Sequence, residues 1–364
     1  MIVAADRLVT AGHDGPGWIE IENGVVVARG DGPRGGAEAT VIPGFVDIHA
    51  HGALGHDVGS TDAAGLADVI GYHAARGTTS LVASVATSPL ADLDRAVAFL
   101  RPFVERGDLV GTHLEGPYLS PLRRGAHNPD LLRSPRVDEI RALVATGGDT
   151  VRMITIAPEL EGAEESIRWL AATGVVAAVG HSDADASTAR AAFGWGATVI
   201  THLFNGMRPL HHREPGIVGA ALADDRVIVE LILDGQHVAA EAAEIVRRAA
   251  PGRLALVSDS MSATGCGDGD YDLAGSAVRV SNGVATLVHG DSLAGSTATV
   301  STGFGLLVAG GTPLPEAAAI TSTTPARALG LAEPLAVGSP ADLLVVEGGR
   351  VLRVMRRGEW LASS

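Results

Sequence analysis

The chain contains no lysine: all 27 of its basic residues are arginine. This excludes lysine Schiff bases, the usual lysine-containing phosphate loops and metal sites bridged by a carboxylated lysine. A single cysteine, Cys266, excludes an intrachain disulfide and a zinc ribbon, and we assign it no role. No charge-poor apolar run reaches the roughly 18 residues that a membrane-spanning helix needs. Residues 1–10 lack the basic stretch and apolar run of a signal peptide, so we expect a soluble, cytoplasmic protein.

Basic charge is also scarce overall, and the net charge at neutral pH is −15. Phosphate backbones and anionic membrane surfaces are bound by basic stripes, so we expect neither nucleic acid nor a membrane as a partner. The 364 residues, 46% of them apolar, are enough for one large domain or two ordinary ones with a substantial core.

The central part of the chain alternates apolar runs with alanine-rich stretches of helical spacing. Continuous apolar runs are typical of buried parallel strands, and strand–helix alternation favours parallel pairing. We therefore predict an α/β fold, a (β/α)8 TIM-type barrel, with a doubly wound open sheet as the alternative. The expected strands are residues 45–48, 79–85, 109–114, 153–156, 175–179, 198–201, 227–233 and 254–257.

Both ends of the chain carry β-type runs and turn signals without helical spacing. Asn23-Gly24 lies between two apolar runs, which is a hairpin signal, and Gly348-Gly349 lies between two more. We predict a small β-sandwich domain built from residues 1–43 and 334–364, and a catalytic barrel domain over residues 44–333.

Metal-ligating residue types follow several of the expected strands. His49 and His51 end the first strand, Glu115 the third, His181 the fifth and His202 the sixth. Barrel geometry brings strand ends together round one mouth. Histidine nitrogens and carboxylate oxygens are the standard ligands of zinc and similar divalent ions. A lone His-x-His is a weak signal, but the full set predicts a metal site, in which Glu115 is the evident carboxylate for bridging two ions.

Two further residues suit hydrolytic chemistry. Asp259 ends the last expected strand, and a carboxylate there can accept a proton from water and deliver it to a leaving nitrogen. The alternative is an aspartate that caps the next segment. His127, on the long loop after the third strand, can donate a hydrogen bond to a developing oxyanion, or is a plain loop histidine. Together these residues indicate metal-assisted amide hydrolysis.

Arg213 and His237 are the evident cations for an anionic substrate. The arginine fork suits phosphate or carboxylate, although each residue alone is equally typical of a salt bridge or a cap. Six other histidines have no place at a strand end, and we expect them at the surface or behind the ligands: His13, His56, His73, His211, His212 and His289.

Specific motifs occur in a fixed order over about residues 43 to 330. They are PGFVDIHAHG at 43–52, HLEGPY at 113–118, GAHNP at 125–129, GHS at 180–182, THLFNGM at 201–207, REPG at 213–216, DGQHV at 234–238, SD at 258–259 and SLAGS at 292–296. This order resembles the amidohydrolase superfamily and, within it, the N-acetylglucosamine-6-phosphate deacetylases. The chain departs from that pattern at Gly206, where alanine is common, and at residues 258–262.

The resemblance implies a ligand set and a cofactor. Glu115, His181 and His202 would hold the principal metal, while His49 and His51 stand where some members of the family bind a second one. We therefore expect one or two divalent ions per chain, with zinc first and iron, manganese or cobalt as alternatives.

The resemblance also implies a substrate and an assembly. Asp259 matches the catalytic aspartate, and His127 matches the histidine that steadies the carbonyl oxygen. Arg213 and His237 would hold a 6-phosphate, in a site completed by the neighbouring subunit of a homodimer. The sugar pocket would be lined by Ala126, His127, Asn205, Gly206, Leu293, Ala294 and Gly295.

The expected reaction is hydrolysis of N-acetylglucosamine-6-phosphate to glucosamine-6-phosphate and acetate, in amino-sugar catabolism and cell-wall sugar recycling. One alternative is another amidohydrolase activity: a deacetylase of a related amino-sugar phosphate, a cyclic amidase or a deaminase, since one metal cluster serves them all. A more distant alternative is a non-catalytic barrel module. The Arg213 and His237 pair favours a phosphorylated sugar, and the intact ligands with Asp259 argue against the module.

Overall fold

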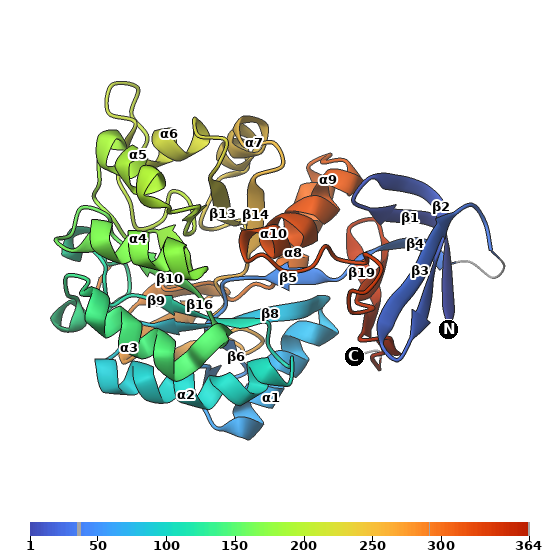
Figure 1. The fold of residues 1–364 in the computed structure, drawn as a ribbon, viewed down its shortest axis with the longest axis horizontal. Coiled ribbons are helices and arrows are strands. Elements are labelled where there is room, and N and C mark those ends of the chain that lie inside the picture. The colour runs from blue at the N-terminus through green and yellow to red at the C-terminus, as the bar shows by residue number, and fades with distance from the viewer. Residues whose placement is uncertain (35–37, 291, 363–364) are drawn as a thin grey trace.

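The computed structural model describes residues 1–34, 38–290 and 292–362, and its central feature is an eight-stranded parallel sheet (Figure 1). Its strands follow one another in chain order, and all eight expected apolar runs are strands with small changes at their ends. They are β5 (Phe45–Asp47), β8 (Thr78–Ala86), β9 (Gly111–Glu115), β10 (Val151–Ile156), β11 (Val176–Val179), β12 (Val199–Ile200), β13 (Ile228–Ile232) and β14 (Leu254–Val257).

The sheet closes into a barrel just beyond the ends of its first and last strands. The Asp259 N–H donates to the His49 carbonyl at 2.9 Å, and the His51 N–H donates to the Ser260 carbonyl at 2.7 Å. Ala50 and Ser260 form a parallel bridge between them. The predicted barrel is therefore confirmed over the open sheet, and its closing hydrogen bonds are made by the segments that carry candidate site residues.

Helices cover the outside of the barrel (Figure 1). The capping chemistry is local: Asp62 accepts the Gly65 N–H before the first helix, and Asp185 accepts the Thr188 N–H before another. No helix among the described residues is long and apolar enough to cross a membrane. The helices are α1 (Ala63–Ala75), α2 (Leu90–Glu105), α3 (Val137–Gly147), α4 (Ala163–Thr173), α5 (Ala186–Trp195), α6 (Gly216–Leu222), α7 (Ala240–Ala249), α8 (Val300–Ala309), α9 (Leu314–Ala318) and α10 (Thr324–Ala328).

The two ends of the chain share one seven-stranded sheet beside the barrel, as predicted (Figure 1). Ile21 near one edge and Met355 near the other belong to the same apolar core. The two edges of the sheet also approach each other. Gly24 precedes the strand at one edge and Arg357 precedes the strand at the other, and a Cβ added at Gly24 would lie 2.6 Å from the Arg357 carbonyl oxygen. The sheet therefore curls round its core in the manner of a sandwich. Its order is β20 (Glu359–Trp360), β19 (Arg350–Arg356), β18 (Leu343–Glu347), β4 (Glu38–Pro43), β1 (Ile2–Thr10), β2 (His13–Glu22) and β3 (Val25–Asp31).

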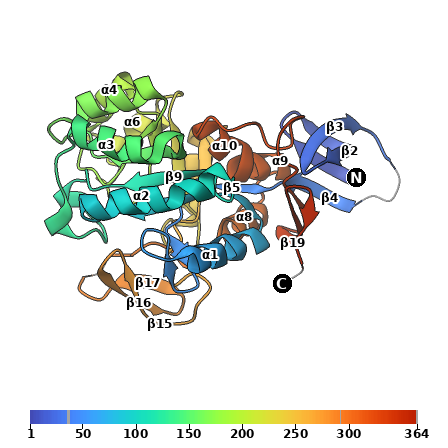
Figure 2. The ribbon, with the colours of Figure 1, turned by 60° about the horizontal axis from the view of Figure 1, so that its bottom comes forward.

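A three-stranded antiparallel sheet after β14 was not expected from the sequence (Figure 2). It consists of β15 (Gly269–Leu273), β16 (Ser276–Ser281) and β17 (Val284–Leu287), and it has a small apolar core of its own. The turn between its last two strands is Asn282-Gly283, with both residues at positive φ. This is the same hairpin signal that marks Asn23-Gly24.

Candidate metal-dependent active site

Most of the residues predicted at the strand ends line one cavity of about 480 Å³ at the mouth of the barrel, and His49 is fully buried behind its lining. The lining carries charge and imidazole nitrogen at its floor and small residues towards its rim. The floor residues come from the ends of β5, β9, β11, β12 and β14 and from the loop that follows β9: His51, Glu115, His127, His181, His202 and Asp259.

Glu115 lies between two pairs of histidines. Its Oε1 is 2.9 Å from His202 Nε2 and 3.1 Å from His181 Nε2. Its Oε2 is 3.1 Å from His51 Nε2 and 3.5 Å from His49 Nε2. One buried carboxylate therefore faces both halves of the site, which is the arrangement that a bridging ligand requires.

The imidazoles are oriented from behind by hydrogen bonds at Nδ1. An acceptor at Nδ1 fixes the proton there, which leaves the Nε2 lone pair facing the cavity. Three of the rings have such an acceptor: His49 donates to the Glu230 carboxylate at 3.1 Å, His51 to the Ser84 carbonyl at 2.9 Å and His181 to the Arg123 carbonyl at 2.9 Å.

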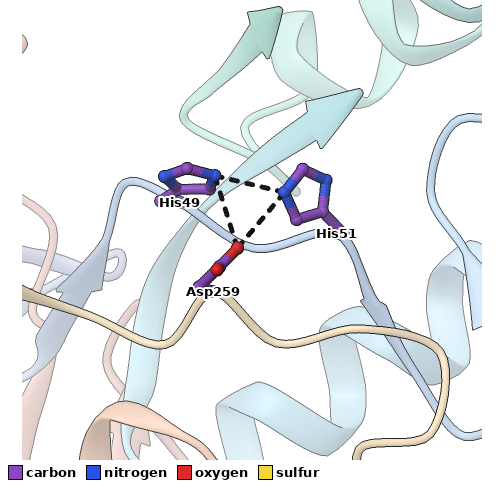
Figure 3. Close-up of side chains that lie close together, drawn as sticks. All are labelled: His49, His51 and Asp259. Atoms are coloured by element: carbon purple, nitrogen blue, oxygen red, sulfur yellow. Dashed lines mark hydrogen bonds and ion pairs between the residues drawn. The ribbon is translucent and has the colours of Figure 1, made fainter. Parts of the chain in front are cut away.

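Within each pair the Nε2 atoms approach closely, at 3.1 Å between His49 and His51 and 3.1 Å between His181 and His202. Two lone pairs at that distance are stable only with a positive charge between them, so the donor set fits a divalent metal. Figure 3 shows His49, His51 and Asp259 pointing towards one another, with Asp259 Oδ1 at 3.5 and 3.3 Å from the two Nε2 atoms.

Two groups of potential ligands result, and they differ in part from the expected sets. Asp259 joins His49 and His51 in one group, and His127 joins Glu115 and His181 in the other. His202 remains within 3.1 Å of both Glu115 and His181. The geometry thus allows Asp259 to act either as a ligand or as a free carboxylate beside the metal.

The electrostatics of the site reflect this crowding of opposite charges. Burial alone would raise the pKa of the Asp259 carboxyl, but the His49 and His51 rings hold that pKa below its ordinary range. Burial alone would lower the pKa of His51, but Asp259 and Glu115 raise it to about 9. The carboxylates therefore create a strongly negative potential where a cation would bind.

His127 has the protonation state of a hydrogen-bond donor. The Thr87 N–H donates to its Nδ1 at 3.4 Å, so the neutral ring carries its proton on Nε2. That Nε2 lies 3.4 Å from Glu115 Oε2, on the cavity side. Burial lowers the pKa of His127 to about 4, so the ring is neutral at physiological pH. The geometry suits the role expected for this residue.

Three site residues have left-handed backbone conformations, with φ of 45° at His181, 27° at His202 and 48° at Asp259. Non-glycine residues rarely adopt these angles, and such strain is concentrated at functional sites. At Asp259 the strained turn is held by the barrel-closing bond to His49 and by the Ser296 N–H, which donates to the Asp259 carbonyl at 2.7 Å.

The rim of the cavity contains most of the residues expected to line a sugar pocket. Ala294 is the exception, since it is fully buried in the small core under β15–β17. At Gly206 an added Cβ would lie 2.8 Å from His181 Nδ1, so glycine leaves that imidazole room. The expected lining residues that do face the cavity are Ala126, His127, Asn205, Gly206, Leu293 and Gly295.

The two expected phosphate ligands are separated. His237 lies in the cavity wall, where its Nδ1 is 2.8 Å from Asp234 Oδ2. Arg213 is exposed on the loop between β12 and α6, with its Nη1 2.8 Å from His212 Nε2, and it does not line the cavity. Arg123 and Arg124 line the cavity instead, and neither was predicted as a site residue because both lie on a loop and not at a strand end.

His73 is not a surface residue. Its ring is fully buried on α1, with Nε2 3.1 Å from the Ser260 hydroxyl, so of the two expected positions it has the one behind the site. His73 lies on the buried face of α1, next to the buried residue Ala74. It supports the barrel-closing segment that contains Asp259.

This burial predicts a pH dependence of stability. Burial lowers the pKa of His73 from 6.5 to about 4, so the unfolded chain binds this proton more readily. The resulting stability is complete above pH 6.5 and is lost as the pH falls towards 4, by about 3 kcal/mol. We expect His73→Gln to show a correspondingly smaller drop in the free energy of unfolding between pH 7 and pH 4, measured by urea denaturation. An identical drop in both proteins would contradict this.

Residues 40–361 match the amidohydrolase family. The chain belongs to this family. It is 37% identical to an N-acetylgalactosamine-6-phosphate deacetylase of Escherichia coli O157:H7, over 91% of this chain and 90% of that protein. It is 36% identical to an N-acetylglucosamine-6-phosphate deacetylase of Vibrio furnissii, over 84% and 78% of the two chains.

The amidohydrolase fold is also shared with solved structures. An aspartate-to-alanine variant of the Mycobacterium smegmatis N-acetyl-D-glucosamine-6-phosphate deacetylase, in complex with N-acetyl-D-glucosamine-6-phosphate, is 45% identical. It superimposes with a TM-score of 0.95 over 99% of this chain and 98% of that one. As a member of the amidohydrolase family, the protein is a metal-dependent hydrolase, and its described residues include two groups of histidines and carboxylates that could hold a metal ion.

Proposed function

We propose that the protein hydrolyses the acetamide of N-acetylglucosamine-6-phosphate to glucosamine-6-phosphate and acetate, in amino-sugar catabolism and cell-wall sugar recycling in the cytoplasm. The observation that carries the proposal is the Glu115-centred cluster, which faces Asp259 and His127 in one cavity. Its substrate class is supported by the Vibrio furnissii and Mycobacterium smegmatis deacetylases. We assign the chemistry to residues 44–333 and propose residues 1–43 and 334–364 as a separate domain.

The proposed ligands of the principal metal are Glu115, His181 and His202, and those of a second ion are His49 and His51 with Glu115 as the bridge. Zinc is our first choice for both. A divalent ion held by these residues would supply Lewis acidity towards the amide carbonyl and would lower the pKa of water towards about 7.

Asp259 and His127 would handle the proton and the developing charge. The Asp259 carboxylate accepts a proton from the attacking water and then delivers it to the leaving sugar nitrogen. The His127 Nε2–H donates a hydrogen bond to the carbonyl oxygen as negative charge builds on it, which contributes about 3 kcal/mol in comparable oxyanion holes. This role requires a proton on His127 Nε2, and the Thr87 N–H that donates to Nδ1 places the proton of the neutral ring there.

The sugar would lie over the small residues of the rim, with Ala126, Asn205, Gly206 and Gly295 leaving room for it. His237 would contact the phosphate from within the same chain. Since Arg213 lies outside its own cavity, we propose that it serves the cavity of a neighbouring chain in a homodimer. An N-acetylgalactosamine-6-phosphate substrate is the second candidate, favoured by the Escherichia coli O157:H7 relative.

The experiment that tests the proposal is acetate release from the 6-phosphates of N-acetylglucosamine, N-acetylgalactosamine and N-acetylmannosamine. The metal content of the same sample is measured in parallel, and unphosphorylated N-acetylglucosamine is the control. We expect the highest kcat/KM for N-acetylglucosamine-6-phosphate. Hydrolysis of none of the four amides by the metal-loaded protein would refute the proposal.

The second metal site leads to a separate prediction. His49→Gln combined with His51→Gln is expected to lower the metal content from about two ions per chain towards one, because a carboxamide binds these ions less well than imidazole. Elemental analysis after loading and dialysis measures this. The exposed pair His211→Gln and His212→Gln is the matched control and is expected to leave the count unchanged. An unchanged count in the first variant would exclude a metal at His49 and His51.

A further inference from the structure

Glu230 is a fully buried carboxylate behind the proposed metal ligands. It projects from β13, and its side chain has no exposed surface. Its Oε2 accepts the His49 Nδ1–H at 3.1 Å and the His202 main-chain N–H at 3.2 Å. Its Oε1 has no hydrogen-bond partner among the described residues. One carboxylate oxygen thus touches a member of each histidine pair.

The main chain of Glu230 adds a third contact. Its carbonyl accepts the Leu203 N–H at 2.8 Å, so β13 holds two consecutive residues of the turn that follows β12. This is the turn in which His202 has a φ of 27°. This conformation orients the His202 ring towards Glu115, and the hydrogen bonds from Glu230 help to hold the turn in that conformation.

The ion-pair partner of the Glu230 carboxylate is the His49 imidazole, which balances a negative charge only when it is protonated. Buried carboxylates are almost always paired with a cation, because leaving the charge alone in a low-dielectric interior is costly. Its hydrogen-bond partners among the described residues are an imidazole N–H and a main-chain N–H, with no arginine. A metal ion in front of His49 would supply the missing positive charge.

We infer that Glu230 is a positioning residue for both metal sites, and above all for the second. It keeps the His49 proton on Nδ1, so that the Nε2 lone pair faces the cavity, and its charge favours a cation there. Its influence on His202 is weaker, because it acts there on the main chain. This inference rests on the proposed metal ligands.

The test compares Glu230→Gln and Glu230→Leu with the wild-type protein. In Glu230→Gln the carboxamide oxygen can still accept both hydrogen bonds, but the negative charge is gone. In Glu230→Leu the hydrogen bonds and the charge are all lost. Zinc titration of the metal-free protein against a competing chelator gives the two dissociation constants. We expect Glu230→Leu to weaken the second ion by roughly 10- to 100-fold and Glu230→Gln by less, with the first ion changed only a few-fold.

The control is Glu139→Gln. Glu139 lies on α3 and is paired with Arg133, and this variant is expected to leave both dissociation constants unchanged. Unfolding temperatures of the metal-free proteins are measured in parallel. The inference is overturned if both ions bind to the Glu230 variants as to the wild type. It is also overturned if both ions weaken equally in step with a lower unfolding temperature, which would show a structural role only.

Two further results keep the test decisive. Should Glu230→Leu fail to fold, Glu230→Gln decides, and an unchanged second constant in that variant overturns the inference. His49→Gln is titrated alongside. If His49→Gln binds two ions as the wild type does, the proposed second site is wrong and the inference is wrong with it. If His49→Gln loses an ion but the Glu230 variants bind both ions normally, only the inference is overturned.

Discussion

Asp259→Asn is expected to lower kcat for acetate release by two to four orders of magnitude while the protein remains folded. The carboxamide has nearly the same size as the carboxylate but cannot accept a proton from water or return one to nitrogen. The hydrogen bonds that hold this turn are made by the main chain of Asp259 with His49 and Ser296, and the substitution leaves them in place. The effect should therefore be on turnover and not on stability.

Metal analysis of the same samples separates the two roles that the geometry allows for Asp259. Its Oδ1 is 3.3 Å from His51 Nε2, close enough for both residues to hold one ion. We expect the principal ion to be retained and turnover to be lost. A variant that keeps a substantial fraction of wild-type turnover would exclude the proton-transfer role. Loss of one ion per chain would identify Asp259 as a ligand.

The fold was predictable because its elements depend on local patterns. The barrel strands are buried on both faces, so they occur as continuous apolar runs, and helices occupy alanine-rich stretches between them. The sheet formed by β15–β17 was missed although Asn282-Gly283 marks its hairpin. Its strands are short and largely exposed, so their apolar alternation is weak.

The candidate site residues were predictable where they lie just after the end of a barrel strand. His181 and His202 directly follow β11 and β12, and barrel geometry alone brings them together. Glu230 was missed because its partners are 181 and 28 residues away in the chain. A signal was present: a glutamate in the middle of the apolar run 227–233 must be buried and therefore needs a polar partner. The exposed position of Arg213 depends on loop conformation, which no periodicity reports.

Arg213→Ala is expected to reduce kcat/KM for N-acetylglucosamine-6-phosphate by about a hundredfold or more and to change activity on the unphosphorylated sugar little. The chain has no lysine and a net charge of −15, so a phosphorylated substrate needs local arginines or histidines. The measurement is the ratio of kcat/KM for the phosphorylated over the free sugar. His237→Ala should show the same selectivity more weakly, because its Nδ1 is already bonded to Asp234 and one ring nitrogen offers less than the arginine fork. An unchanged ratio in Arg213→Ala would move the phosphate site elsewhere, with Arg123 and Arg124 in the cavity wall as the next residues to replace.

Mixed subunits then show whose cavity Arg213 serves. Arg213 is exposed outside its own cavity, so we expect it to act on the partner's substrate. Asp259→Asn and Arg213→Ala are each expected to be strongly impaired as homodimers. In a mixed dimer, the chain with Arg213→Ala supplies Asp259 and the other chain supplies Arg213, which makes one of the two sites complete. Random association of equal amounts should therefore restore about a quarter of the wild-type sites. If Arg213 acted within its own chain, neither site of the mixed dimer would contain both residues, and mixing would restore no activity.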